Sequence, residues 1–154
     1  MMREILFRGK RCDNGEWVKG YYIRAEHHWH KHGIHKDWIT LGASANGGWF
    51  VLHNKYAVNA ETVGQFAGLT DKNGKKIFEG DIGGYKQVDG AKRNGKPITC
   101  IGKVVYNVKT ASFAVESKDE TGCKYFDYFP IKDFEVIGNI HDNPELLRGE
   151  EDGK

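Results

Sequence analysis

Asparagine-glycine pairs between short apolar runs are the feature that most constrains the fold of this chain. They occur at Asn14-Gly15, Asn46-Gly47, Asn73-Gly74 and Asn94-Gly95. Both residue types tolerate left-handed backbone conformations, so the pair favours a tight β-hairpin turn. The chain also holds twenty glycines against three prolines, and 12% of its residues are aromatic. We therefore expect a mainly β protein, built from short strands joined by tight turns.

Alternating side chains mark the expected strands. The clearest strand runs from Thr99 to Val108. Residues 61–69 fit either a helix or a strand, and we favour the strand because two glycines there weaken a helix by about 1 kcal/mol each. Loops are expected at 42–48 and 85–97, and residues 24–36 are expected to form a polar hairpin. Further strands are expected at 4–8, 16–23, 38–41, 49–53, 56–58, 76–78, 112–117, 123–129 and 134–137.

The strand over residues 16–23 has apolar residues on both of its faces. A period of two places Trp17, Lys19, Tyr21 and Ile23 on one face, and Val18, Gly20 and Tyr22 on the other. Such a strand is expected to be sandwiched or curved. Gly20 fits a bend or a close approach of another backbone segment.

The order of elements predicts two regions. Residues 1–60 are expected to form an N-terminal β-hairpin region, packed with a small SH3-like β-barrel over residues 61–148. A short C-terminal helix is expected to begin at Asn143-Pro144, with the asparagine as its cap. Residues 149–154 are expected to be a disordered tail.

The step Glu79-Gly80-Asp81 offers two carboxylates on one side of a strand. Paired acids can bind magnesium or perform acid-base chemistry, with Glu61 as a third acid, which would suit a metal-dependent hydrolase. The alternative is turn chemistry, in which Gly80 takes an unusual backbone angle and Asp81 accepts backbone N–H groups. We favour the turn, as we do for Asn14-Gly15 and Asn73-Gly74.

Five of the seven histidines lie between residues 24 and 36. On a strand, His28, His30 and His32 would share one face and could bind zinc or nickel, with His35, His53 or Asp37 as a further ligand. The alternative is a solvated polar hairpin without a metal, and we favour it. No cofactor is expected.

A nucleic-acid interface is a further hypothesis. The net charge is +2, with +5 on residues 1–77 and −3 on residues 78–154, which favours a mixed, solvated surface over a basic stripe. A stacking groove is nevertheless conceivable, because aromatic residues have basic neighbours in the sequence. Its members would be Trp29, Trp38, Trp49 and Tyr85, with Arg24, Lys31, Lys36 and Lys86.

The cellular setting follows from what the chain lacks. No run of 18 apolar residues crosses a membrane, and the first residues carry charge where a signal peptide is apolar. Three distant cysteines, Cys12, Cys100 and Cys123, predict reduced thiols rather than disulfides or a zinc site. We expect a cytoplasmic protein. No phosphate loop, nucleophile elbow or Cys/His signature is present.

Three segments resemble the YopX family of small bacteriophage and prophage proteins. They are MREILFRGKRCDNGEWVKGYY near the start, ETVGQFAGLTDKNGKKIFEGDI in the middle and EVIGNIHDNPELL near the end. The resemblance implies a β-rich phage-type protein without an established activity, and it brings no catalytic residues. Gly83-Gly84 departs from the apolar-basic pair that is usual in the family, which leaves the strand after Asp81 open.

Together these patterns predict a non-enzymatic phage or prophage accessory protein that acts by binding a phage or host protein. A homo-oligomer is expected, because aromatic residues on both faces of short strands exceed what one small core can bury. A nucleic-acid-binding module is the alternative. A metal-dependent hydrolase using Glu79 and Asp81 is the second alternative.

Overall fold

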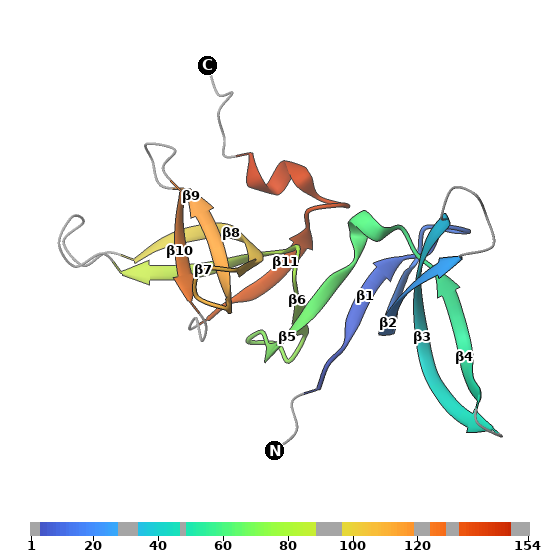
Figure 1. The fold of residues 1–154 in the computed structure, drawn as a ribbon. Helices are drawn as coiled ribbons and strands as arrows, with labels where there is room; N and C mark the ends of the chain where they lie inside the picture. Colours follow the sequence, from blue (N-terminus) through green and yellow to red (C-terminus); the bar gives the residue numbers. More distant parts are fainter. Residues whose placement is uncertain are drawn as a thin grey trace. The chain divides into compact units, whose positions relative to one another are not determined.

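A computed structural model describes residues 4–27, 34–46, 49–88, 97–118, 124–128 and 133–148. The chain divides into two compact units, Met1–Phe66 and Ala67–Lys154. The prediction placed the boundary at residue 60, whereas the division lies inside strand β5. The described strands form two antiparallel sheets, so the prediction of a mainly β protein is confirmed (Figure 1).

The first unit is built on four consecutive antiparallel strands and the start of a fifth. Each strand pairs with the next, in the order β4-β3-β2-β1, and β5 then pairs with the other side of β1. The 3-10 helix η1 (Ala60–Thr62) leads into β5. The strands are β1 (Phe7–Lys10), β2 (Trp17–His27), β3 (Ile34–Asn46), β4 (Trp49–Ala57) and β5 (Gly64–Thr70).

Close packing of backbone against side chain forms the core of the first unit. Ile39 is fully buried, and a Cβ at Gly9 or Gly20 would meet its side chain within 3.3 Å. At Gly20 the added atom would also lie 2.3 Å from the Thr40 carbonyl oxygen, so only glycine fits there. An isolated bridge between Arg11 and Val58 brings the residue after β4 back to the end of β1. The sheet therefore curls around one buried face.

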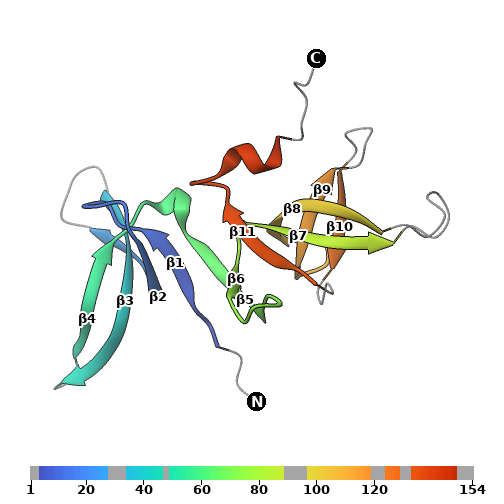
Figure 2. The ribbon, with the colours of Figure 1, turned by 180° about the vertical axis from the view of Figure 1, so that it is seen from behind.

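The second unit contains a five-stranded antiparallel sheet in the order β10-β9-β8-β7-β11 (Figure 2). Its core cluster includes Tyr85, Val104, Val115, Phe134 and Val136. The elements after β5 are β6 (Lys76–Phe78), β7 (Asp81–Val88), β8 (Pro97–Asn107), β9 (Ser112–Lys118), β10 (Lys124–Tyr128), β11 (Glu135–Asn139) and the 3-10 helix η2 (Pro144–Leu147).

Two finer predictions for the second unit are not confirmed. The sheet order ends at β10 on one side and at β11 on the other, so the described strands do not close into the expected SH3-like barrel. The expected C-terminal helix is the single 3-10 turn η2. Asn143 occupies the N-cap position and Pro144 begins the turn, as predicted, but the Asn143 side chain makes no capping bond. Its backbone N–H instead donates to the carbonyl of Asn139.

Several strands are longer than predicted. Residues 24–27 belong to β2, residues 43–46 to β3, and residues 85–88 to β7. Residues 64–70 are a strand, so the choice of strand over helix is confirmed. The pair Gly83-Gly84 continues β7 without interruption, because both residues pair with β8 and β11. Polar and glycine-rich segments are thus held as strands by pairing with neighbouring strands.

Candidate functional site

The exposed face of the first unit's sheet gathers positive charge. Ile39, Gly9 and Gly20 lie on the buried face, so the alternate positions of each strand lie on the opposite one. Register places Arg8 opposite Lys19, and Lys10 opposite Trp17. None of the described strand positions of this face in β1–β4 is Asp or Glu. We call it the basic face and define it by its cations and rings, Arg8, Lys10, Trp17, Lys19, Tyr21, Lys36, Trp38 and Lys55.

Trp38 is the best-defined ring of the basic face. The ammonium nitrogen of Lys55 lies 5.3 Å from the centroid of its ring, and that of Lys36 lies 6.0 Å away. Strand pairing brings Lys55 to the indole from β4, whereas Lys36 lies two residues from Trp38 on the same face of β3. Each contact stabilises by about 0.5–1 kcal/mol at an exposed site. Trp38 is therefore a half-buried ring in contact with two cations.

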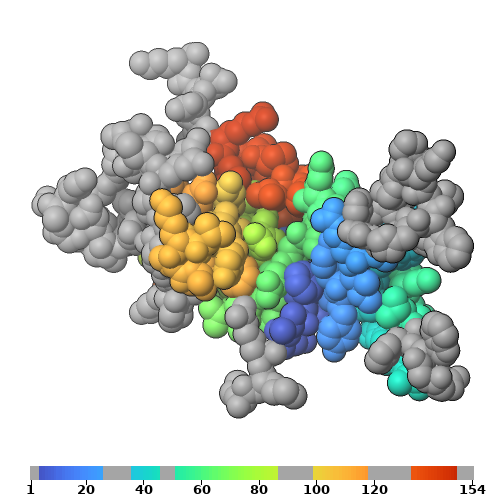
Figure 3. Space-filling view, viewed as in Figure 1, coloured from blue at the N-terminus to red at the C-terminus, as the bar shows by residue number. Residues whose placement is uncertain are grey.

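Trp17 repeats this arrangement on β2. The guanidinium carbon of Arg8 lies 4.7 Å from the centroid of its ring, and the Lys10 nitrogen lies 5.5 Å away. Between the two tryptophans, Tyr21 is 57% exposed. In the space-filling view the atoms of β1 and β2, in blue, adjoin one another (Figure 3). Aromatic rings and cations therefore alternate across the pleated surface.

On the buried face of the same sheet, the charged side chains contact each other. The Tyr22 hydroxyl donates a short hydrogen bond to Oδ1 of Asp37, and Nε of Arg24 lies 3.9 Å from the same oxygen. Burial, followed by the hydrogen bond to Asp37, raises the pKa of the Tyr22 phenol above its ordinary value. Arg24 and Asp37 thus pair with each other.

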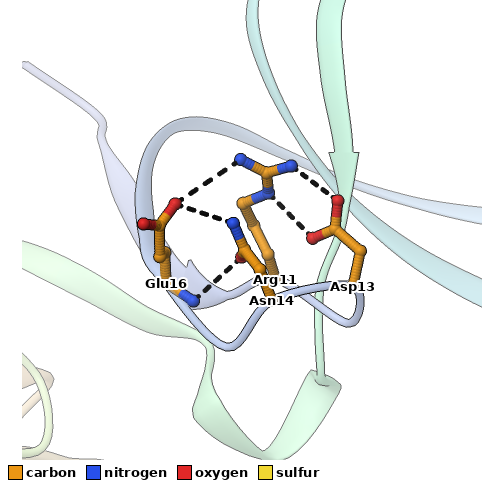
Figure 4. A network of polar contacts seen from close by, with 4 residues as sticks. All are labelled: Arg11, Asp13, Asn14 and Glu16. Carbon is orange, nitrogen blue, oxygen red and sulfur yellow. Dashed lines mark hydrogen bonds and ion pairs between the residues drawn. The ribbon is translucent and has the colours of Figure 1, made fainter.

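The turn between β1 and β2 carries a polar network (Figure 4). The Arg11 guanidinium donates to both carboxylate oxygens of Asp13, at 2.9 and 2.5 Å, and approaches Glu16 at 3.8 Å. The hydrogen bond to Asp13 raises the pKa of Arg11 and lowers that of Asp13. Oδ1 of Asn14 accepts the N–H of Glu16. This network holds the turn together, with one guanidinium between two carboxylates.

The predicted stacking groove is only partly found. Trp38 and Lys36 come together on the basic face, whereas Arg24 lies on the opposite face. Tyr85 is buried in the core of the second unit with its hydroxyl 3.3 Å from Ser117 Oγ, so its assignment as a stacking residue is wrong. Lys86 is exposed on β7, and Trp49 begins β4. Trp29 and Lys31 lie outside the described residues.

In the acid pair after β6, Asp81 accepts a hydrogen bond from the backbone. Asp81 is 1% exposed, and its Oδ2 accepts the N–H of Phe78 at 2.8 Å. Gly80 has a φ of 80°, and its N–H donates to the carbonyl of Val104. Glu79 is half-buried beside it. Glu61 is exposed in η1 of the first unit.

The three histidines of the predicted metal site, His28, His30 and His32, lie outside the described residues. Among the possible further ligands, His53 is exposed on the basic side with its Nε2 2.7 Å from Ser44 Oγ. Asp37 lies on the other face of the same sheet. Within the described parts of the chain, no group of three or more His, Cys, Asp or Glu could hold a metal ion.

Asp71 is a residue that sequence reasoning missed. Its Oδ1 accepts the N–H groups of Asn73 and Lys75, both at 2.9 Å, and its Oδ2 accepts that of Val136 at 3.0 Å. The Asp-x-Asn-Gly order of the turn was the available signal, because aspartate favours the first position of such turns. Gly15 and Gly74, the predicted turn glycines, have φ values of 73° and 81°.

The fold and this surface define a β-rich protein with a basic, aromatic sheet face and buried carboxylates that bind its own backbone. No helix among the described residues is long and apolar enough to cross a membrane. A family model described as YopX protein matches residues 6–148, and the chain belongs to the YopX family. The resemblance seen in the sequence is thereby confirmed.

Comparison with solved structures supports the fold. The crystal structure of protein EF1440 from Enterococcus faecalis is similar to this chain, with 24% sequence identity and a TM-score of 0.54. The match covers 95% of this chain and 99% of that chain. At this identity the likeness concerns the fold alone. None of the curated proteins matches the chain.

Proposed function

We propose that this YopX-family protein is a non-enzymatic, phage-type accessory protein that acts by binding, and that it binds through the basic face. The observation that carries the proposal is the collection of Tyr21, Trp38 and Lys55 on the solvent side of a sheet whose other side forms the core. Aromatic rings and cations are enriched where proteins bind partners. The phage setting rests on the family.

The placement of the acids supports a binding role over a hydrolase. A catalytic carboxylate must reach a substrate, yet Asp71 and Asp81 are buried and accept backbone N–H groups. Cys12 and Cys100 are not part of a disulfide, which suits the reducing cytoplasm of a host cell. A protein of this kind needs neither a cofactor nor a catalytic centre.

Capture from phage-infected cells tests the proposal. Purified protein is used as bait beside a K36A/K55A variant, which removes both cations from the Trp38 ring. We expect a partner that the unchanged protein retains and the variant loses, while circular dichroism shows that the variant is still folded. Capture that is equal for both would overturn the basic face as the binding surface. Hydrolysis of a phosphodiester by the unchanged protein but not by E79A or D81A would overturn the non-enzymatic role.

Self-association is a second proposal, and a separate observation favours it. At the end of β8, Val108 is 81% exposed and Tyr106 is 44% exposed, and Ile137 on β11 is 44% exposed. Apolar side chains in such number at a surface favour association between copies. Light scattering in about 0.15 M salt measures the mass, and a value of 17.4 kDa, that of one chain, would remove this proposal.

A further inference from the structure

Charge narrows the class of ligand for the basic face. Of the cations on the face, Lys19, Lys36 and Lys55 are exposed, Lys10 is half-buried and Arg8 is buried, while the described strand positions of the face in β1–β4 hold no acid. The chain as a whole has a net charge of only +2. Strand pairing therefore collects these cations on one face of the sheet. A surface of this kind attracts a polyanion.

The aromatic rings of the basic face narrow the class of ligand further. Tyr21 is 57% exposed, and Trp38 lies diagonally across from it on β3, since Tyr21 pairs with Thr40. Residues two apart on a strand lie about 6.6 Å apart, so rings and cations repeat along β2 and β3 at a short interval. Exposed rings beside cations serve to stack unpaired bases while the cations contact the phosphates. A duplex hides the faces of its bases, so it cannot use the rings.

We infer that the basic face binds single-stranded nucleic acid, with phosphates on Lys10, Lys19, Lys36 and Lys55 and a base stacked on Tyr21. This inference rests on the proposed binding function and names its ligand. From Lys19 to Ala25, β2 covers about 20 Å at about 3.3 Å per residue, which is enough for several nucleotides. DNA and RNA share the chemistry used here, and the experiment separates them.

Fluorescence anisotropy of labelled DNA and RNA oligonucleotides, each about 16 nucleotides long, tests the inference with tag-free full-length protein. For four phosphate contacts on a single strand, the logarithm of the affinity falls against the logarithm of the salt concentration with a slope of about −3 between about 0.05 and 0.2 M salt. We expect binding to at least one of the two strands with a slope of this size. Whichever of DNA and RNA binds more tightly is the natural class of ligand.

Two variants separate charge from stacking. K36A/K55A is expected to flatten the slope to about −1.4, since two of four phosphate contacts are lost. Y21A is expected to weaken binding by about 5- to 100-fold while leaving the slope unchanged, because a ring contributes stacking and no charge. K75A/K109A removes two exposed lysines of the second unit and serves as the matched control. Circular dichroism and thermal melting confirm that each variant is folded.

The inference is overturned if neither strand binds at about 0.05 M salt, if K36A/K55A binds as the unchanged protein does, or if duplex binds as tightly as single strand. Sedimentation with anionic vesicles, without oligonucleotide binding, would also overturn it in favour of a membrane surface. Failure here is distinct from failure of the binding function. If K36A/K55A still loses a nuclease-resistant protein partner from infected cells, the basic face binds protein and only the nucleic-acid ligand is wrong.

Discussion

Asp71 shows at the scale of one residue how a buried charge can stabilise this fold. Burial disfavours its carboxylate, but the N–H groups of Val136, Lys75 and Asn73 outweigh that cost and lower its pKa below the ordinary value. A buried carboxylate with three N–H donors is satisfied at both oxygens. It ties the turn after β5 to β11, at the far end of the sequence of the second unit.

The substitution D71N is expected to destabilise the protein by about 1–3 kcal/mol at neutral pH, because an amide group cannot accept all three bonds. The folded-state pKa of Asp71 is lower than the unfolded one, so its contribution is present above about pH 4 and is lost as pH falls through the folded value. Urea denaturation at neutral pH and near pH 3 measures the difference, which should shrink in acid.

The exposed Glu145 supplies the control for this experiment, as E145Q also removes one negative charge. It should leave the unfolding free energy within about 0.5 kcal/mol of the unchanged value. A loss for D71N that is equally large at both pH values would show that the carboxylate charge contributes nothing.

At the scale of elements, the close packing of β7 against Phe134 shapes the core of the second unit. A Cβ at Gly83 would lie 2.1 Å from the nearest ring atom of Phe134, whereas at Gly84 the nearest atom is the Cys100 carbonyl oxygen at 4.0 Å. Successive residues of a strand point to opposite faces, so only the first glycine lies under the ring. The two glycines are adjacent and of the same residue type, but the packing requires glycine only at the first of them.

The pair G83A and G84A is therefore a matched test of the fold. G83A is expected to destabilise by about 1–3 kcal/mol or more, because the added methyl group displaces the buried Phe134 ring. G84A is expected to be neutral or slightly stabilising, because alanine reduces the freedom of the unfolded chain. Thermal melting of both variants measures the difference, and equal melting temperatures would contradict the packing of Phe134 on Gly83.

At the scale of the whole molecule, exposed apolar side chains predict association between copies. Val108 lies in the turn between β8 and β9, where its side chain contributes little to the folded monomer. V108S is thus expected to lower the mass seen by light scattering towards 17.4 kDa without changing the melting temperature. K109S, at the adjacent exposed position, is the control and should keep the assembly. An unchanged mass for V108S would exclude this turn from the contact.

Local patterns in the sequence were sufficient for much of the secondary structure. The alternation over residues 99–108 predicted β8, and its set containing Cys100, Gly102 and Val104 is the buried one. Glycines at Asn14-Gly15 and Asn73-Gly74 have the left-handed angles that such turns need. These features depend on a few consecutive residues, so they can be read without knowing any distant partner.

The candidate surface could be predicted only in part. The sequence placed Trp17, Lys19, Tyr21 and Ile23 on one face of a strand, but it could not say which face was buried. Pairing with β1 and β3 settles this, since it puts Gly20 against Ile39 and turns the other face outward. Pairing also brings Lys55 to Trp38 from a separate strand.

The sequence by itself determined the β class, the family and most turns, because these follow from local backbone preferences and collinear segments. Tertiary structure alone decided the open sheet in place of a barrel, the core position of Tyr85 and the binding of the Val136 N–H by Asp71. It also decided the gathering of cations on one face. Each depends on contacts between separate strands and turns, and for the faces of a sheet a shift in register by one residue would exchange them.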